Sequence, residues 1–135
     1  MNTKKFILSS LIVYVVFEVL NFLIHGVILS DMYMRTASLW RADMDQMMWI
    51  IYVGDILKAF LFVFIFTKGL ENKGWAEGMR FGLLMGLYVA IGMGFGSYAM
   101  YPIPFILALQ WFIYVTIQLV ICGIVAAIIY KPAKK

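Results

Sequence analysis

Four long apolar segments occupy most of the sequence and constrain its fold more than any other feature. They cover residues 6–29, 47–67, 77–100 and 105–129. Each is about as long as the ~20 residues with which an α-helix crosses the hydrocarbon core of a bilayer. The chain is 64% hydrophobic and 13% charged, whereas soluble domains are about half apolar and a quarter charged. We therefore predict an all-α integral membrane protein, a single domain of residues 1–135 whose four transmembrane helices form an up-down bundle.

The ends of the apolar segments carry residues that fit helix boundaries. Lys4 and Lys5 precede the first segment as in a secretory signal, but this segment runs past ~15 apolar residues and has no small-residue cleavage site. We expect it to remain as a span. Asp43, with Gln46 three residues later, resembles a capping box before the second helix. Two prolines in residues 101–104 remove two backbone donors and predict a tight turn before the fourth helix.

The basic residues divide unevenly between the two sides of the predicted bundle. Because cytoplasmic loops carry the excess of lysine and arginine, both termini should be cytoplasmic. The net charge of +4 then reports topology and attraction to lipid headgroups, and we predict no nucleic-acid partner. The terminal side carries Lys4, Lys5, Lys68, Lys73, Arg80, Lys131, Lys134 and Lys135, and the other side carries Arg35 and Arg41.

The longest connection, residues 31–46, mixes methionines and Leu39 with charged side chains. We expect a short amphipathic segment on the outer membrane surface, with Trp40 at headgroup depth. A methionine-rich lid or a site for a soft metal is the alternative. Since these methionines have no thiolate or histidine beside them, we predict no metal here.

Small residues recur at every fourth position of the third apolar segment, as Gly78, Gly82, Gly86, Ala90 and Gly94. This spacing leaves a groove in which a neighbouring backbone can approach closely, as in small-xxx-small helix pairs. Packing within the chain is favoured over a seam between copies, because a four-helix chain already offers partners.

Three of the predicted helices carry polar side chains on one face. Residues three or four apart in a helix share a face, which groups the polar residues of each segment. The groups are Tyr14, Glu18, Asn21 and His25 in the first, Asp55 and Lys58 in the second, and Gln110, Tyr114 and Gln118 in the fourth.

The depths of these side chains decide which of them can meet. At ~1.5 Å per residue from the outer helix ends, Glu18 and Lys58 both lie ~17 Å deep, and Asn21 and Asp55 both ~12 Å deep. Charged groups that face lipid are costly, so these side chains should face inward. Lys58 should pair with Glu18 or with Asp55, and the other acid should be protonated or hydrogen-bonded.

The sequence lacks the residues that the common redox, haem and metal sites need. His25 is the only histidine and Cys122 the only cysteine, so one chain cannot supply a bis-histidine haem, a CxxC redox pair or a cysteine metal cage. The interval from Glu18 to His25 does not match helical metal ligands. We predict no enzyme activity, no cofactor and no metal.

The sequences FEVLNFLIHG, ASLWR, FIFTKGLENKG and EGMRFGLLMG resemble the small four-helix bacterial membrane proteins that are grouped as domains of unknown function. The resemblance implies an all-helical fold in the bacterial inner membrane. It implies no activity and no catalytic residue.

Two functional interpretations follow. In the favoured one, the polar residues hold the helices together in a structural or accessory membrane protein, which contacts lipids and is a possible homo-oligomer or subunit of a larger complex. In the alternative, Glu18, His25, Asp55 and Lys58 form a polar site for proton-coupled transport or permeation of a small solute.

Overall fold

The computed structural model describes residues 1–131, and within this range it is helical without strands. Four helices are long and apolar enough to cross a membrane, so the predicted all-α bundle is confirmed. Residues Lys134 and Lys135, which entered the topology prediction, lie outside the described range. The spans are built from α1 (Thr3–Asn21) with η1 (Phe22–Ile28), α3 (Met44–Lys68), α4 (Trp75–Ile91) with η3 (Gly92–Gly96) and α5 (Ser97–Met100), and α6 (Phe105–Ile129).

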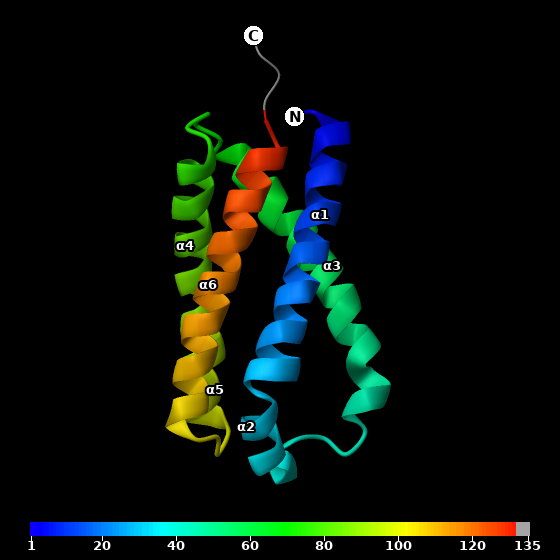
Figure 1. The fold of residues 1–135 in the computed structure, drawn as a ribbon, viewed down its shortest axis with the longest axis vertical. Helices are drawn as coiled ribbons and strands as arrows, with labels where there is room; N and C mark the ends of the chain where they lie inside the picture. Colours follow the sequence, from blue (N-terminus) through cyan, green and yellow to red (C-terminus); the bar gives the residue numbers. More distant parts are fainter. Residues whose placement is uncertain (132–135) are drawn as a thin grey trace.

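The helices run alternately up and down, and the N-terminus and the end of α6 lie at the same end of the bundle (Figure 1). We call this the terminal end; it also holds the loop of residues 69–74 between α3 and α4. The opposite end, the hairpin end, holds α2 (Ser30–Arg35), η2 (Ala37–Leu39) and the turn of residues 101–104. The predicted tight turn at the two prolines is therefore present.

The connection at the hairpin end packs against the bundle. Leu29 is fully buried, and Met32, Tyr33 and Trp40 pack against the hydrophobic cluster that contains it. The predicted capping box is wrong: the Asp43 side chain makes no bond to the first turn of α3 and instead pairs with Arg41 at 2.9 Å. The neighbouring guanidinium outcompetes backbone amides for this carboxylate and holds its pKa below the usual value.

Helices α4 and α6 pack more closely than any other pair, because glycines of α4 face the α6 backbone. A β-carbon added at Gly78 would overlap the carbonyl group of Gly123, and one added at Gly86 would lie 2.9 Å from Thr116 Cα. At Gly94 the added atom would lie 2.7 Å from the Ala108 carbonyl oxygen. The glycine row is therefore used within the chain, while dispersion between the two backbones replaces larger side chains.

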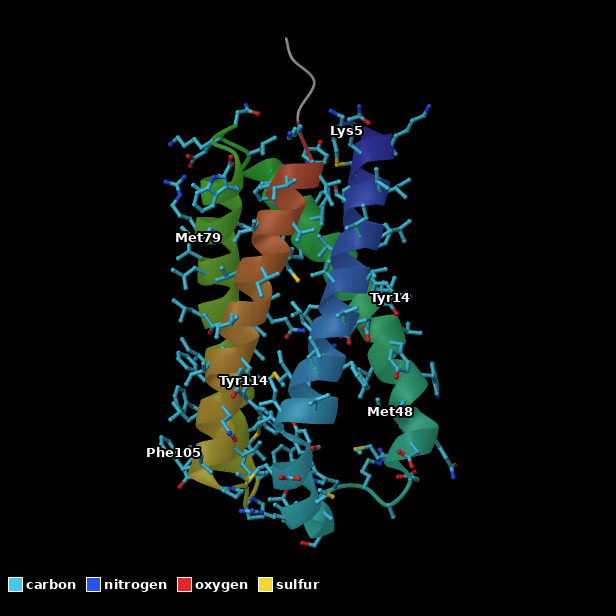
Figure 2. The ribbon with its side chains drawn as sticks, in the orientation of Figure 1. Lys5, Tyr14, Met48, Met79, Phe105 and Tyr114 are labelled. Carbon is cyan, nitrogen blue, oxygen red and sulfur yellow. The ribbon has the colours of Figure 1, made fainter. Side chains whose placement is uncertain are left out.

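Helix α3 is packed only over part of its length. Its second half buries Ala59, Phe62, Val63 and Phe66 in the hydrophobic cluster near the terminal end. Its first half diverges from α1 toward the hairpin end, where Figure 2 shows Met48 away from the bundle. Between 47% and 62% of each residue in the run 49–53 is exposed. The first half of α3 is therefore apolar and largely exposed, with no other helix of residues 1–131 packed over it.

Candidate functional site

Four polar side chains from three helices form a closed hydrogen-bonded group, which we call the polar clamp. Lys58 Nζ lies 2.7 Å from Asp55 Oδ1, and Asn21 Nδ2 donates to Asp55 Oδ2 at 3.1 Å. Gln118 Nε2 donates to Asn21 Oδ1 at 2.8 Å and to the Phe17 carbonyl oxygen at 3.1 Å. Both oxygens of the Asp55 carboxylate are therefore paired, and α1, α3 and α6 are joined through side chains.

The clamp satisfies the requirement that buried polar groups be hydrogen-bonded. Asp55 is 1% exposed and Gln118 2% exposed, so each would lose much free energy if its partners were removed. Of the two pairings open to Lys58, the structure has the one within α3, with Asp55. A three-residue spacing brings these two side chains together on one helix face.

Glu18 remains outside this network although it lies beside it. Its Oε1 atom is buried and has no hydrogen-bond partner within residues 1–131. Its carboxyl group is close enough to Asp55 and Lys58 for their charges to act on it. Tyr14, one turn earlier on α1, is half-buried and packs against the hydrophobic cluster that includes Val13 and Val63 (Figure 2). The structure thus divides the predicted polar residues into a closed clamp and a leftover acid.

Lys58 differs from its partner in its surroundings. Its side chain is 68% exposed, whereas that of Asp55 is 1% exposed. The ammonium group also lies 5.9 Å from the centre of the Phe17 ring on α1, within the range of a cation–π contact. Lys58 therefore sits at the edge of the α1–α3 junction, with its charge compensated on one side only.

His25 takes part in a different group, at the hairpin end. Its Nδ1 lies 2.6 Å from the Tyr33 hydroxyl, which also accepts a hydrogen bond from Trp111 Nε1 at 2.7 Å. Trp40 packs against both Tyr33 and Trp111. Burial raises the pKa of Tyr33 to about 12, and the bond from Trp111 opposes part of this rise. We call these four residues the aromatic group.

The separation of His25 from the clamp has a local cause. The predicted stripe assumes an α-helix from Tyr14 to His25, but the chain is π-helical over Phe22–Ile28. A wider π turn rotates later residues backward relative to the α-helical stripe. His25 therefore points to α2, and the predicted ladder of side chains is interrupted after Asn21.

The remaining predicted residues of α6 lie near the aromatic group. The Gln110 side-chain oxygen is buried without a partner in the part of the chain that the structure describes. Tyr114 is half-buried and packs against the hydrophobic cluster of Leu107 and Trp111. Of the three α6 residues, Gln118 belongs to the clamp.

Sequence reasoning missed Tyr33 and Trp111 and also a buried carboxylate at the terminal end. Glu77 is 5% exposed and accepts hydrogen bonds from the backbone N–H groups of Glu71 and Lys73. It thereby fixes the loop of residues 69–74 against α4. The exposed Glu71 pairs with Lys73 at 2.6 Å, which lowers the pKa of Glu71, as does the nearby Arg80. The sequence signal for this role of Glu77 is its position as the third residue of α4, where a glutamate side chain often bonds to backbone N–H groups that precede the helix.

Two surface cavities lie at the ends of the bundle. One of about 520 Å³ at the terminal end is lined by Trp75, Ile128 and Lys131, among others, and one of about 330 Å³ at the hairpin end by Tyr33, Trp40 and Arg41, among others. Neither is lined by a clamp residue. Cys122 is buried in the core, and residues 1–131 contain no group of three potential metal-binding side chains.

No family model, no curated protein and no solved structure matches the chain.

Proposed function

We propose that the protein binds and releases a proton at Glu18 within the bilayer, as part of proton-coupled transport. The observation that supports this proposal is the buried Glu18 oxygen without a partner, next to the paired carboxylate of Asp55. The hydrogen bonds of the clamp give a structural role to Asn21, Asp55, Lys58 and Gln118. Glu18 takes no part in these bonds. An ionisable side chain inside a membrane that no structural network requires is a candidate functional group.

The charge balance at this position favours a protonated Glu18. Lys58 supplies one positive charge, which Asp55 already neutralises through direct contact. A second negative charge beside this neutral pair would be uncompensated within the membrane, which is costly. We therefore propose that Glu18 is neutral, since both Asp55 oxygens are engaged with Lys58 and Asn21. Release of the proton would create a second negative charge that must be compensated, which couples proton movement to another ion or to a change in helix packing.

The test uses purified protein in liposomes with an imposed pH gradient. Wild type should carry protons, and Glu18→Gln, which keeps the shape but cannot ionise, should abolish the flux while its melting temperature stays unchanged. Gln46→Leu, an exposed substitution in the first turn of α3, serves as the control with wild-type flux. Proton flux at the wild-type rate in Glu18→Gln would exclude Glu18 as the exchanging group.

A second candidate function, an accessory subunit, has its own supporting observation. Lys58 is 68% exposed near the middle of a membrane span, and the first half of α3 has no cover. A transmembrane partner that packs on α3 would remove both from lipid. Stable recovery of this chain with one stoichiometric membrane protein, lost in Lys58→Met, would favour this candidate; a chain that remains alone after mild extraction would oppose it.

Orientation and location follow from the charge distribution and the resemblance. We propose the bacterial inner membrane, with the terminal end in the cytoplasm. Lys5, Lys68, Lys73 and Lys131 lie at that end, and cytoplasmic segments carry the basic excess. We also propose that the α4 glycines act as a glycine zipper within one chain, since α6 already occupies their face.

A further inference from the structure

The cavity of about 520 Å³ at the terminal end lies between the loop of residues 69–74, the start of α4 and the end of α6. Its volume falls within the range of about 300–1,000 Å³ that ligand sites in proteins occupy. On the α6 side its wall is apolar, with Ile124, Ala127 and Ile128. None of the lining residues belongs to the clamp or to the aromatic group.

Three side-chain donors on the rim of this cavity are not used within the described chain. Asn72, Trp75 and Lys131 line the cavity. Their amide, indole N–H and ammonium groups make no hydrogen bond or salt bridge to atoms of residues 1–131. Donors without an internal partner at the edge of an apolar cavity suit a ligand that carries acceptor oxygens.

The loop that carries Asn72 is fixed in place by Glu77. The buried Glu77 carboxylate accepts hydrogen bonds from the backbone N–H groups of Glu71 and Lys73, one on each side of Asn72. Asn72 has a φ of 64°, a left-handed conformation that asparagine adopts more readily than most residues. The backbone on both sides of Asn72 is therefore held, and a ligand pays little to order this part of the rim.

The depth of the cavity limits the kind of ligand. α6 ends at Ile129 and α4 begins at Trp75, so the rim lies where the spans leave the hydrocarbon layer. Ile124 lies five residues before the end of α6, which is ~8 Å deeper along the helix axis. A ligand that fills the cavity needs a polar part at the level of the lipid headgroups and an apolar part below it. A phospholipid has this form.

The charges at the cavity favour a negatively charged lipid. Lys131 makes no salt bridge within residues 1–131, and the Lys5 ammonium donates to the Lys131 carbonyl oxygen, which brings a second cation to the same residue. The acidic lining residue, Glu77, uses both of its carboxylate oxygens for N–H groups of the loop. Basic pockets between transmembrane helices bind anionic headgroups.

We propose that this cavity binds one anionic phospholipid from the surrounding bilayer. Asn72, Trp75 and Lys131 donate hydrogen bonds to oxygens of its phosphate and headgroup, and the upper part of an acyl chain packs on Ile124 and Ile128. Such a site differs from the general attraction of a basic surface to anionic lipids. General attraction depends on the sum of the charges, whereas a bound lipid depends on Lys131.

The experiment measures the binding of single lipids to the full chain, delipidated in detergent, by native mass spectrometry. The probes are phosphatidylglycerol and phosphatidylcholine with the same acyl chains. Wild type should bind one phosphatidylglycerol at least ~5-fold more tightly than phosphatidylcholine, since one basic side chain near an anionic headgroup contributes about this factor. Lys131→Gln should remove this preference. Lys4→Gln is the matched control, because it removes the same charge from the same end outside the cavity, and it should bind like wild type.

Two further pairs of variants test the other contacts. Trp75→Phe keeps an aromatic ring but deletes the N–H donor, so it should weaken phosphatidylglycerol binding at least ~5-fold, since hydrogen bonds to charged groups contribute at least this factor. Trp49→Phe, at an exposed tryptophan outside the cavity, should not. Ile128→Ala should weaken the binding of both lipids, whereas Ile117→Ala, also exposed on α6 but outside the cavity, should bind like wild type.

Equal losses of affinity in Lys131→Gln and Lys4→Gln would reduce the binding to general charge attraction and overturn the site. Wild type that binds both lipids with the same affinity would overturn it as well. Glycerol phosphate, which has no acyl chain, should not compete at concentrations that phosphatidylglycerol needs to bind; equal competition would exclude a lipid as the occupant. Melting temperatures identify any misfolded variant, and the substitutions at Lys131, Trp75 and Ile128 each test the site without the others.

Discussion

Asp55 and Lys58 form an ion pair of 2.7 Å in which one side chain is 1% exposed and the other 68% exposed. Lys58 lies ten residues before the end of α3 at Lys68, which is ~15 Å along the helix and farther than a lysine side chain extends. The ammonium group therefore stays in the hydrocarbon layer, and Asp55 is its compensating charge. This pair anchors the clamp electrostatically, while Asn21 and Gln118 connect it to α1 and α6.

Removal of the lysine charge should destabilise the bundle through Asp55. We expect Lys58→Met to lower the free energy of unfolding by about 2 kcal/mol, between the values typical of exposed and of fully buried ion pairs. Asp55→Asn in the same chain should restore most of the loss, because no unpaired charge remains. Chemical denaturation in detergent measures both, with Lys68→Met as the control at the exposed end of α3. Additive effects of the two substitutions would contradict a coupled pair.

The amide side of the clamp leads to a separate prediction. Gln118→Leu deletes the donor to the Asn21 side-chain oxygen and to the Phe17 carbonyl oxygen, and it leaves the Asn21 oxygen without this partner in the core. The free energy of unfolding should fall by ~1–3 kcal/mol. Gln46→Leu, the same change at an exposed position of α3, should have little effect. Equal melting temperatures for the two leucine variants would show that the clamp contributes nothing to stability.

The contact between α4 and α6 should tolerate no added volume at Gly86. A β-carbon there would lie 2.9 Å from Thr116 Cα, whereas one at Gly92 in the same span would meet nothing within 4 Å. Gly86→Leu should therefore cost at least ~1–3 kcal/mol, the range for overpacked cores. Leu84→Ala, at a residue 69% exposed to the membrane side, and Gly92→Leu should remain near wild type. If Gly86→Leu has the same melting temperature as these two controls, the close backbone contact is not required for stability.

The fold could be predicted from the sequence because the physical signals were strong and local. Four apolar segments gave the spans, and the structure extends the second by three residues at its start, to Met44. The depth estimate that placed Asn21 level with Asp55 matches their hydrogen bond. Depth follows from a constant helical rise, which depends little on tertiary contacts.

The details of the candidate site depended on features that one-dimensional patterns do not contain. The π-helical turn at Phe22–Ile28 redirected His25, and its only sequence sign is Gly26 among apolar residues. The aromatic group needed α2 to fold back toward α6, so that Tyr33 could meet Trp111 across 78 residues of sequence. The Asp43 side chain pairs with Arg41 and not with the backbone N–H groups of the first turn of α3. A capping pattern in the sequence does not reveal this competition.

The arrangement of the ends predicts which positions react from each side of the membrane. In a Cys122→Ser background, Lys73→Cys should be labelled by an impermeant thiol reagent only after cells are opened, because the loop of residues 69–74 shares the terminal end with the N-terminus. Ser38→Cys at the hairpin end should be labelled in intact cells. Both residues are exposed, so accessibility differs only by side. Labelling of Lys73→Cys in intact cells would invert the proposed orientation.

The partly buried phenol of Tyr33 in the aromatic group should make stability fall at high pH. The pKa of Tyr33 is raised from 10.0 to about 12 in the folded chain, mainly by burial. Between these two values the unfolded chain loses the Tyr33 proton while the folded chain keeps it, so the unfolded state becomes more stable relative to the folded state as pH rises. The contribution is complete below pH 10 and is lost as pH approaches about 12. Protein unfolding in detergent at a series of pH values measures this slope.

Two tyrosine variants separate this effect from general alkaline unfolding. Tyr33→Phe loses the contacts of the hydroxyl with His25 and Trp111, so it should be less stable than wild type at neutral pH. Because it has no phenol to ionise, its stability should fall less steeply between pH 10.0 and about 12, and the gap to wild type should narrow. Tyr101→Phe, at an exposed tyrosine of the hairpin end, should keep the wild-type slope. A constant gap between Tyr33→Phe and wild type across this range would mean that Tyr33 titrates alike in both states.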